Sequence, residues 1–268
     1  TFCLIWFFIL SAAHQKSHAQ KNQQQKVYNA MTLNAFEALH DINFQVEEGD
    51  FVAIMGPSGS GKSTFINNIS TIDIPTNGTV LINGKNIRTM GANEIGTFRS
   101  KNLGFIFQDF NLLDTHTLYE NMAMPMALAH KSKKEIAQRV KELGDTMNIT
   151  PFLNKYPYEC SGGQRQRAAI CRALVNHPNI IVADEPTGNL DSQNSSELMH
   201  IFEKLNKEGV TIVMVTHDPL IASYSSRLIY IKDGNIETVR ERGEMDQDTY
   251  FQKIVEINSA ESREIITK

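Results

Sequence analysis

The segment GPSGSGKST, at residues 56–64, constrains the fold of this chain more than any other stretch. It fits the pattern G-x-x-x-x-G-K-[ST] of a phosphate-binding loop. The apolar run at 51–55 is typical of a buried strand, and apolar residues after the loop follow helical spacing. Glycines let backbone N–H groups turn toward phosphates, and the following helix adds its positive N-terminal end. The residues of this predicted phosphate site are Gly56, Pro57, Ser58, Gly59, Ser60, Gly61, Lys62, Ser63 and Thr64.

A second chemical signal is an acidic pair after a buried strand. In IIVADE, at 180–185, four apolar residues precede two carboxylates, which places the acids at the exposed carboxyl end of a strand. We expect Asp184 to hold Mg²⁺ together with Ser63, as in the general layout of phosphate-loop enzymes. Glu185 is then placed to orient and deprotonate the attacking water. The alternative is a solvated pair of acids without a catalytic role.

Further motifs between and after these two segments identify a family. The stretch CSGGQRQR at 160–167 resembles the LSGGQ signature of ATP-binding cassette (ABC) ATPases, with Cys in the usual Leu position. FIFQDFNLL at 105–113 resembles the Q-loop of that family, PTGNLD at 186–191 the D-loop, and MVTHD at 214–218 the switch-histidine segment. The matching residues are Ser161, Gly162, Gly163 and Gln164 of the signature, Gln108, Asp191 and His217.

The resemblance implies how these residues act. Cassette ATPases work as head-to-tail dimers, in which the phosphate loop of one copy and the signature of a second copy enclose ATP. Ser161 and Gly163 would then face the γ-phosphate across the dimer, from the positive end of a helix. Gln108 would contact Mg²⁺ and the attacking water, and His217 would bind the γ-phosphate and help to position Glu185. An ordinary surface or core histidine is the alternative for His217.

The resemblance covers residues from about 28 to 257 and implies an α/β fold. We expect a phosphate-loop NTPase cassette at 27–240, with a mixed β-sheet nucleotide lobe and an inserted α-helical signature lobe at about 109–172. A helical C-terminal extension would occupy 241–268. Runs typical of strands lie at 51–55, 79–82, 103–107, 180–183, 211–215 and 228–232, and a run of helix formers lies at 132–147.

The first residues depart from the family pattern. TFCLIWFFIL, at 1–10, is apolar for too few residues to cross a bilayer, which takes about 20. The polar stretch that follows has no alternation where the family usually has its first strand, so we expect residues 1–26 to lie outside the cassette. Tyr28 stands at a suitable distance before the phosphate loop to stack on adenine. Without a clear first strand, Tyr28 could instead be a surface aromatic residue.

Composition limits the choice of partners. The chain has 26 basic and 30 acidic residues, a net charge of −4, so no basic field favours nucleic acid. The odd number of cysteines, three, without metal or disulfide spacing, suggests a reducing compartment. In the family, a coupling helix of a separate integral-membrane permease docks beside the Q-loop. Apolar residues that could meet this helix or simply belong to the core are Phe110, Leu112, Leu113, Met122, Met124 and Met126.

The residues that flank the motifs indicate a particular group within the family. The segments at 105–117, 183–192 and 215–234 are similar to ATPases of the macrolide-exporter and lipoprotein-release group, and most closely to bacitracin-type peptide-resistance transporters. The tail at 243–257 resembles their C-terminal extension, although a generic amphipathic tail fits as well. We therefore expect an ATPase that works peripherally at the cytoplasmic face of the membrane. Alternatives are a lipoprotein-release or cell-division ATPase and a soluble cassette ATPase without a permease.

Overall fold

The computed structural model describes residues 24–28, 36–82 and 84–266. They form two compact units, one made of the chain up to Gly91 and from Val213 onward, the other of Ala92–Ile212. Strand β8 (Thr211–Val215) begins in the second unit and ends in the first. None of the helices in the described part of the chain is both long and apolar enough to span a membrane.

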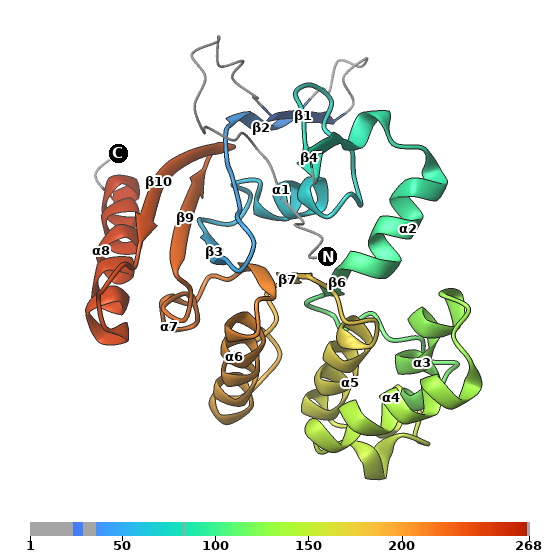
Figure 1. Cartoon of the computed structure of the whole chain (residues 1–268). Coiled ribbons are helices and arrows are strands. Elements are labelled where there is room, and N and C mark those ends of the chain that lie inside the picture. The colour runs from blue at the N-terminus through green and yellow to red at the C-terminus, as the bar shows by residue number, and fades with distance from the viewer. Residues whose placement is uncertain (1–23, 29–35, 83, 267–268) are drawn as a thin grey trace. The chain divides into compact units, whose positions relative to one another are not determined.

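The first unit is built on a mixed β-sheet (Figure 1). Strand β9 (Arg227–Lys232) runs parallel to β3 (Phe51–Met55) on one side and antiparallel to β10 (Asn235–Glu241) on the other. All five residues of β3 and four consecutive residues of β9 are buried, as expected for strands covered on both faces. Helix α1 (Lys62–Ile69) follows β3 after the glycine-rich loop, so this unit carries the strand–loop–helix that the sequence predicts.

An antiparallel pair of strands precedes this sheet in the chain. β1 (Gln24–Tyr28) pairs with β2 (Phe36–Ile42), with irregular register on both sides of Lys26. The expected start of the cassette at residue 27 falls inside β1. A strand is recognised in a sequence by alternating apolar and polar residues, and irregular pairing removes the need for this alternation. The polar residues before Tyr28 therefore gave no indication of β1. The remaining short elements of the unit are β4 (Leu81–Ile82), β5 (Lys85–Asn86), η1 (Ile87–Thr89) and α7 (Pro219–Ala222).

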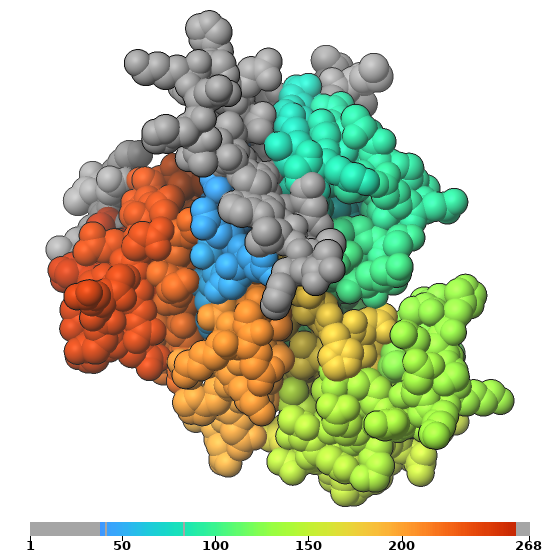
Figure 2. Space-filling view, viewed as in Figure 1, coloured from blue at the N-terminus to red at the C-terminus, as the bar shows by residue number. Residues whose placement is uncertain are grey.

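The first unit ends in helix α8 (Gln247–Ile266), which lies along β10 (Figure 1). Tyr250 and Ile254 of this helix are completely buried. The Tyr250 hydroxyl donates a hydrogen bond of 3.1 Å to the carbonyl oxygen of Arg240 in β10. Burial raises the pKa of the Tyr250 phenol. The red atoms at the C-terminal end of the described chain form one continuous surface with the orange-red atoms that precede them (Figure 2), and the bond from Tyr250 to Arg240 joins the tail helix to the sheet.

The second unit combines two parallel strands with most of the helices. β6 (Leu103–Ile106) pairs with β7 (Ile180–Asp184) in parallel, with Ile106 opposite Ala183. Between these strands the chain forms three helices, each of which starts with a capping box (Figure 1). The helices and turns of the unit are α2 (Ala92–Asn102), α3 (Leu118–Leu128), α4 (Lys133–Thr146), η2 (Thr150–Phe152), η3 (Pro157–Glu159), α5 (Gly162–Leu174) and α6 (Ser192–Lys207).

The apolar segment after the Q-loop divides between core and surface. Phe110, Met122 and Met126 are buried and belong to the core of the second unit. Leu113 remains 44% exposed, and Leu112 and Met124 are partly exposed. Of the six apolar residues considered above, Leu112, Leu113 and Met124 therefore remain candidates for contact with a partner protein.

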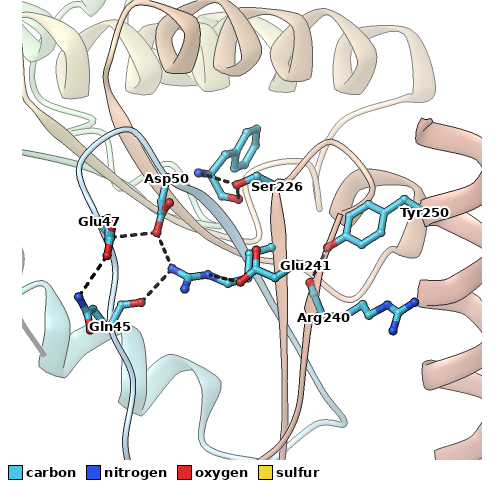
Figure 3. Close-up of polar contacts among 9 residues, drawn as sticks. Gln45, Glu47, Asp50, Ser226, Arg240, Glu241 and Tyr250 are labelled. Carbon is cyan, nitrogen blue, oxygen red and sulfur yellow. Dashed lines mark hydrogen bonds and ion pairs between the residues drawn. The ribbon is translucent and has the colours of Figure 1, made fainter. Parts of the chain in front are cut away.

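A partly buried arginine, Arg227, connects the loop before β3 to the start of β9 (Figure 3). The Arg227 guanidinium pairs with Asp50, donates to the carbonyl oxygen of Gln45 at 2.9 Å and lies 3.7 Å from Glu241. Its carbon atom Cζ also lies 5.5 Å from the centre of the Phe44 ring. The Arg227 side chain is only 18% exposed, so water competes little for these bonds. This cluster fixes the loop that leads into β3, the strand that is followed by the phosphate loop.

Replacing Arg227 with Met should lower the free energy of unfolding by about 2 kcal/mol, because Asp50 and the Gln45 carbonyl lose a charged donor. Arg240→Met is the matched control, since the Arg240 side chain is exposed on the neighbouring strand. The control should change stability by less than about 0.5 kcal/mol. Urea denaturation of both variants measures the difference, and equal stabilities would contradict the role of Arg227.

Candidate nucleotide site

The phosphate loop begins where β3 ends, and its first residue has no room for a side chain. Gly56 has a φ of 148°, and a Cβ built on it would lie 1.9 Å from the carbonyl oxygen of Ile231 in β9. The loop therefore packs directly on the backbone of the neighbouring strand. Pro57, Ser58 and Gly59 are exposed beyond this contact, whereas Ser60 is buried.

Helix α1 starts at the end of the loop with its N-terminus open. Gly61 occupies the N-cap position with a φ of 98°, and no side chain of the described residues caps the helix. The first N–H groups of a helix have no partner inside it, and together with the helix dipole they attract anions. The first turn contains no acidic residue that would repel a phosphate. Ser63, the third residue of the GKS sequence, is exposed at this turn.

The Lys62 ammonium lies across the loop. Its Nζ atom donates to the carbonyl oxygen of Gly56 at 2.9 Å and to that of Pro57 at 2.7 Å. These bonds hold a full positive charge beside the open helix end. A phosphate group in the loop would therefore meet an ammonium group and backbone N–H groups together.

His217 lies at the same edge of the sheet as the phosphate loop. The N–H of Thr216 donates to the carbonyl oxygen of Ile54 at 3.1 Å, so the carboxyl ends of β3 and β8 lie side by side. His217 comes next in the chain and is exposed. The first unit thus brings the predicted switch histidine and the predicted phosphate loop to one edge.

The acidic strand end and the Q-loop lie together in the second unit. Since Ile106 and Ala183 are opposite each other in parallel strands, Gln108 and the acids Asp184 and Glu185 follow at one edge. Both acids are partly buried. Glu185 has a φ of 46°, the left-handed conformation that non-glycine residues rarely adopt and that is frequent at functional sites.

A glycine after the acidic pair lies between the two predicted catalytic side chains of this unit. A Cβ on Gly188 would be 3.7 Å from Gln108 Nε2 and 3.7 Å from Glu185 Oε2. The amide of Asn189 donates to the carbonyl oxygen of Gln108 at 2.8 Å. Sequence reasoning missed Asn189, although it stands inside the D-loop segment that was recognised. A side chain that acts on a backbone carbonyl 81 positions away leaves no local signal.

The signature forms the N-terminus of helix α5. The Ser161 hydroxyl accepts the N–H of Gln164 at 3.3 Å, and the Gln164 side chain accepts the N–H of Ser161 at 3.0 Å. A groove of about 500 Å³ is lined by the signature and by Asn189, Leu190 and Asp191 of the D-loop. Bonds from the backbone N–H and the side chain of Asn194 lower the pKa of Asp191. The unit therefore presents the signature and D-loop together on one polar surface.

The chemistry of the predicted metal ligands Asp184 and Ser63, taken separately, suits Mg²⁺. The described residues contain no group of three or more His, Cys, Asp or Glu side chains that could hold a metal. Mg²⁺ does not need such a cage, since it usually takes one or two protein oxygens and fills its other positions with phosphate and water. The partly buried Asp184 carboxylate and the exposed Ser63 hydroxyl are donors of this kind.

A phosphate loop, an acidic strand end and a signature helix on this α/β scaffold define an ABC ATPase. The chain belongs to the ABC transporter family, whose family model matches residues 39–188. It is therefore an ATP-binding protein and an ATPase, as the sequence predicted.

The relatives of the chain support this conclusion. It is 46% identical to the ABC transporter ATP-binding protein YxdL of Bacillus subtilis (strain 168), over 84% of this chain and 88% of that protein. It is also 46% identical to the bacitracin export ATP-binding protein BceA of Halalkalibacterium halodurans, over 83% of this chain and 88% of that protein.

A solved structure has the same fold. The dimeric structure of the ATP-binding cassette MJ0796, in a post-hydrolysis state bound to ADP and Pi, matches with a TM-score of 0.78 and 40% sequence identity. The match covers 82% of this chain and 97% of that chain. The predicted cassette fold with a mixed sheet is thus confirmed.

Replacing Gly56 with Ala should abolish ATP binding and lower the free energy of unfolding by about 3 kcal/mol, because the new methyl group collides with the Ile231 carbonyl. Gly91→Ala is the control, since nothing lies within 4 Å of a Cβ at that position. Thermal unfolding and binding of a fluorescent ATP analogue test both variants. Normal ATP binding by Gly56→Ala would show that the loop adopts another conformation.

Proposed function

We propose that this chain is the ATP-hydrolysing subunit of a transporter that powers a separate integral-membrane permease and handles bacitracin-like antimicrobial peptides. The observation that carries the substrate class is the 46% identity to a bacitracin export ATP-binding protein over most of both chains. The tail helix α8, packed on the sheet, is consistent with the C-terminal extension expected for this group. The chain would work at the cytoplasmic face of the membrane, held there by its permease.

The proposed working form is a head-to-tail dimer of two copies, with ATP bound between the phosphate loop of one and the signature of the other. The dimeric structure of MJ0796 supports this assembly. The groove that joins the signature to the D-loop is polar and open, as a surface for the phosphates of a second copy should be. Ser161, Gly162, Gly163, Gln164 and Asp191 would contribute to the ATP site of the partner copy.

In the proposed reaction, water attacks the γ-phosphorus of ATP, the bond from this phosphorus to the bridging β,γ-oxygen breaks, and ADP and phosphate result. Glu185 would take the proton of the attacking water. Lys62 and the N–H groups at the start of α1 would bind the phosphate oxygens and stabilise the charge that shifts to the leaving oxygen. His217 would donate a hydrogen bond to the γ-phosphate, and Gln108 would orient the water.

Mg²⁺ would be held by Ser63, Asp184 and Gln108. When bound, it supplies positive charge that neutralises the phosphate oxygens. Stacking of the adenine ring on Tyr28, the last residue of β1, remains a proposal, since the described residues do not include the Tyr28 side chain. The first 23 residues also lie outside the described part of the chain, so their expected separation from the cassette stays a prediction.

Lipoprotein release and cell division are alternative roles for a cassette of this group. They share the ATPase chemistry and differ in the permease and its substrate. Deletion of the gene distinguishes the three roles, because each predicts a different defect in the cell.

Glu185→Gln should lower ATP turnover at least about a hundredfold, because the amide cannot accept the proton of water, while ATP still binds. Lys62→Ala should instead weaken ATP binding itself. Glu208→Gln, an exposed residue after α6, is the control and should leave both properties unchanged. Phosphate release and equilibrium ATP binding separate the two effects, and wild-type turnover by Glu185→Gln would refute its role as the base.

A strain without this gene should become more sensitive to bacitracin-like peptides, because the permease loses its source of energy. The inhibitory concentration should be restored by the wild-type gene and not by the Glu185→Gln copy. If the strain keeps full peptide tolerance but mislocalises lipoproteins or fails to divide, the substrate class proposed here is wrong.

A further inference from the structure

Asn194 of helix α6 holds the D-loop aspartate through two hydrogen bonds. Asp191 Oδ1 accepts the backbone N–H of Asn194 at 2.8 Å, which caps the helix. Asp191 Oδ2 accepts a hydrogen bond from Asn194 Nδ2, also at 2.8 Å. Both carboxylate oxygens of Asp191 are therefore oriented by Asn194.

The other end of the Asn194 amide reaches the signature helix. Asn194 Oδ1 accepts a hydrogen bond of 2.8 Å from the guanidinium of Arg167 in α5. The same guanidinium pairs with Glu197 at 2.7 Å and donates to the carbonyl oxygen of Met147 at 3.2 Å. Arg167 thus has three hydrogen-bond partners, namely Asn194, Glu197 and the Met147 carbonyl, and these bonds fix the position of the Asn194 amide.

The Asn194 amide also lies against the signature itself. A Cβ built on Gly163 would be 3.5 Å from Asn194 Oδ1 and 3.6 Å from both Cγ and Nδ2, which is ordinary van der Waals contact. Gly163 and Asp191 line the same groove of about 500 Å³. The amide thus lies next to one motif, with room for no more than a methyl group between them, and hydrogen-bonds the other.

We propose that Asn194 is a positioning residue that holds the D-loop aspartate and the signature glycine in one fixed arrangement, ready for the second copy of the chain. This inference rests on the shared-site dimer of the proposed function. An amide is suited to the task, because its N–H faces a carboxylate while its oxygen faces a guanidinium. A carboxylate at position 194 would keep the bond to Arg167 but would repel Asp191.

The test uses the full chain with Glu185→Gln, which should form a stable dimer with ATP because hydrolysis is blocked. In this parent, Asn194→Asp should raise the protein concentration at half-dimerisation at least about tenfold, because each of the two copies loses a hydrogen bond to a charged group. ATP binding by the monomer should not change, because the phosphate loop is untouched. Gln193→Ala, on the same turn of α6, should dimerise like the parent.

A second variant at the same position makes the test specific. Asn194→Ala removes the side-chain bonds to Asp191 and Arg167 without adding a charge, and should also raise the protein concentration at half-dimerisation. Analytical ultracentrifugation with ATP measures each variant, and thermal unfolding verifies that each is folded.

The outcomes separate the two proposals. If the parent stays monomeric with saturating ATP, the shared-site function fails and the role of Asn194 fails with it. If the parent dimerises and Asn194→Asp dimerises equally well, only the role of Asn194 is overturned. Dimerisation of Asn194→Ala at the concentration of the parent also overturns it.

Discussion

The close approach of Gly56 to the carbonyl of Ile231 determines where the phosphate loop leaves the sheet. From this point the chain turns outward and returns at Gly61, which starts α1 without a side-chain cap. Lys62, the first residue of this helix, places its ammonium group across the loop, on the carbonyl oxygens of Gly56 and Pro57. A single steric constraint between two backbones thus fixes a concentrated positive site, which is what binding of nucleotide phosphates requires.

The loops of the second unit are held in a different way. Long side chains reach from α5 and the D-loop to backbone carbonyls of the loops: Gln166 to Pro186, Asn189 to Gln108, and Arg172 to both Phe110 and Asn111. Phe110, Asn111 and Glu185 are all left-handed, at a cost on the order of 1–3 kcal/mol each. These bonds offset that strain. The Q-loop and the acidic strand end are therefore held in a conformation that the local sequence would not adopt alone.

The sequence predicted those features that depend on local pattern. The buried strands before Gly56 and Asp184 lie where their apolar runs indicated. Features that depend on distant partners could not be predicted. The polar strand β1 exists through irregular pairing with β2, and the bond from Asn189 to Gln108 joins separate motifs. Burial of Met122 and Met126 likewise follows from packing.

The claim that two copies share each ATP site can be measured by mixing two inactive variants. Lys62→Ala disables the phosphate loop and Ser161→Arg blocks the signature, so each variant alone should hydrolyse almost no ATP. A mixed dimer contains one site with an intact loop and an intact signature. The equimolar mixture should then recover roughly a quarter of the wild-type ATPase rate, since half of the dimers carry one good site of two. If both variants are folded and form mixed dimers but the mixture still hydrolyses almost no ATP, the head-to-tail site is contradicted.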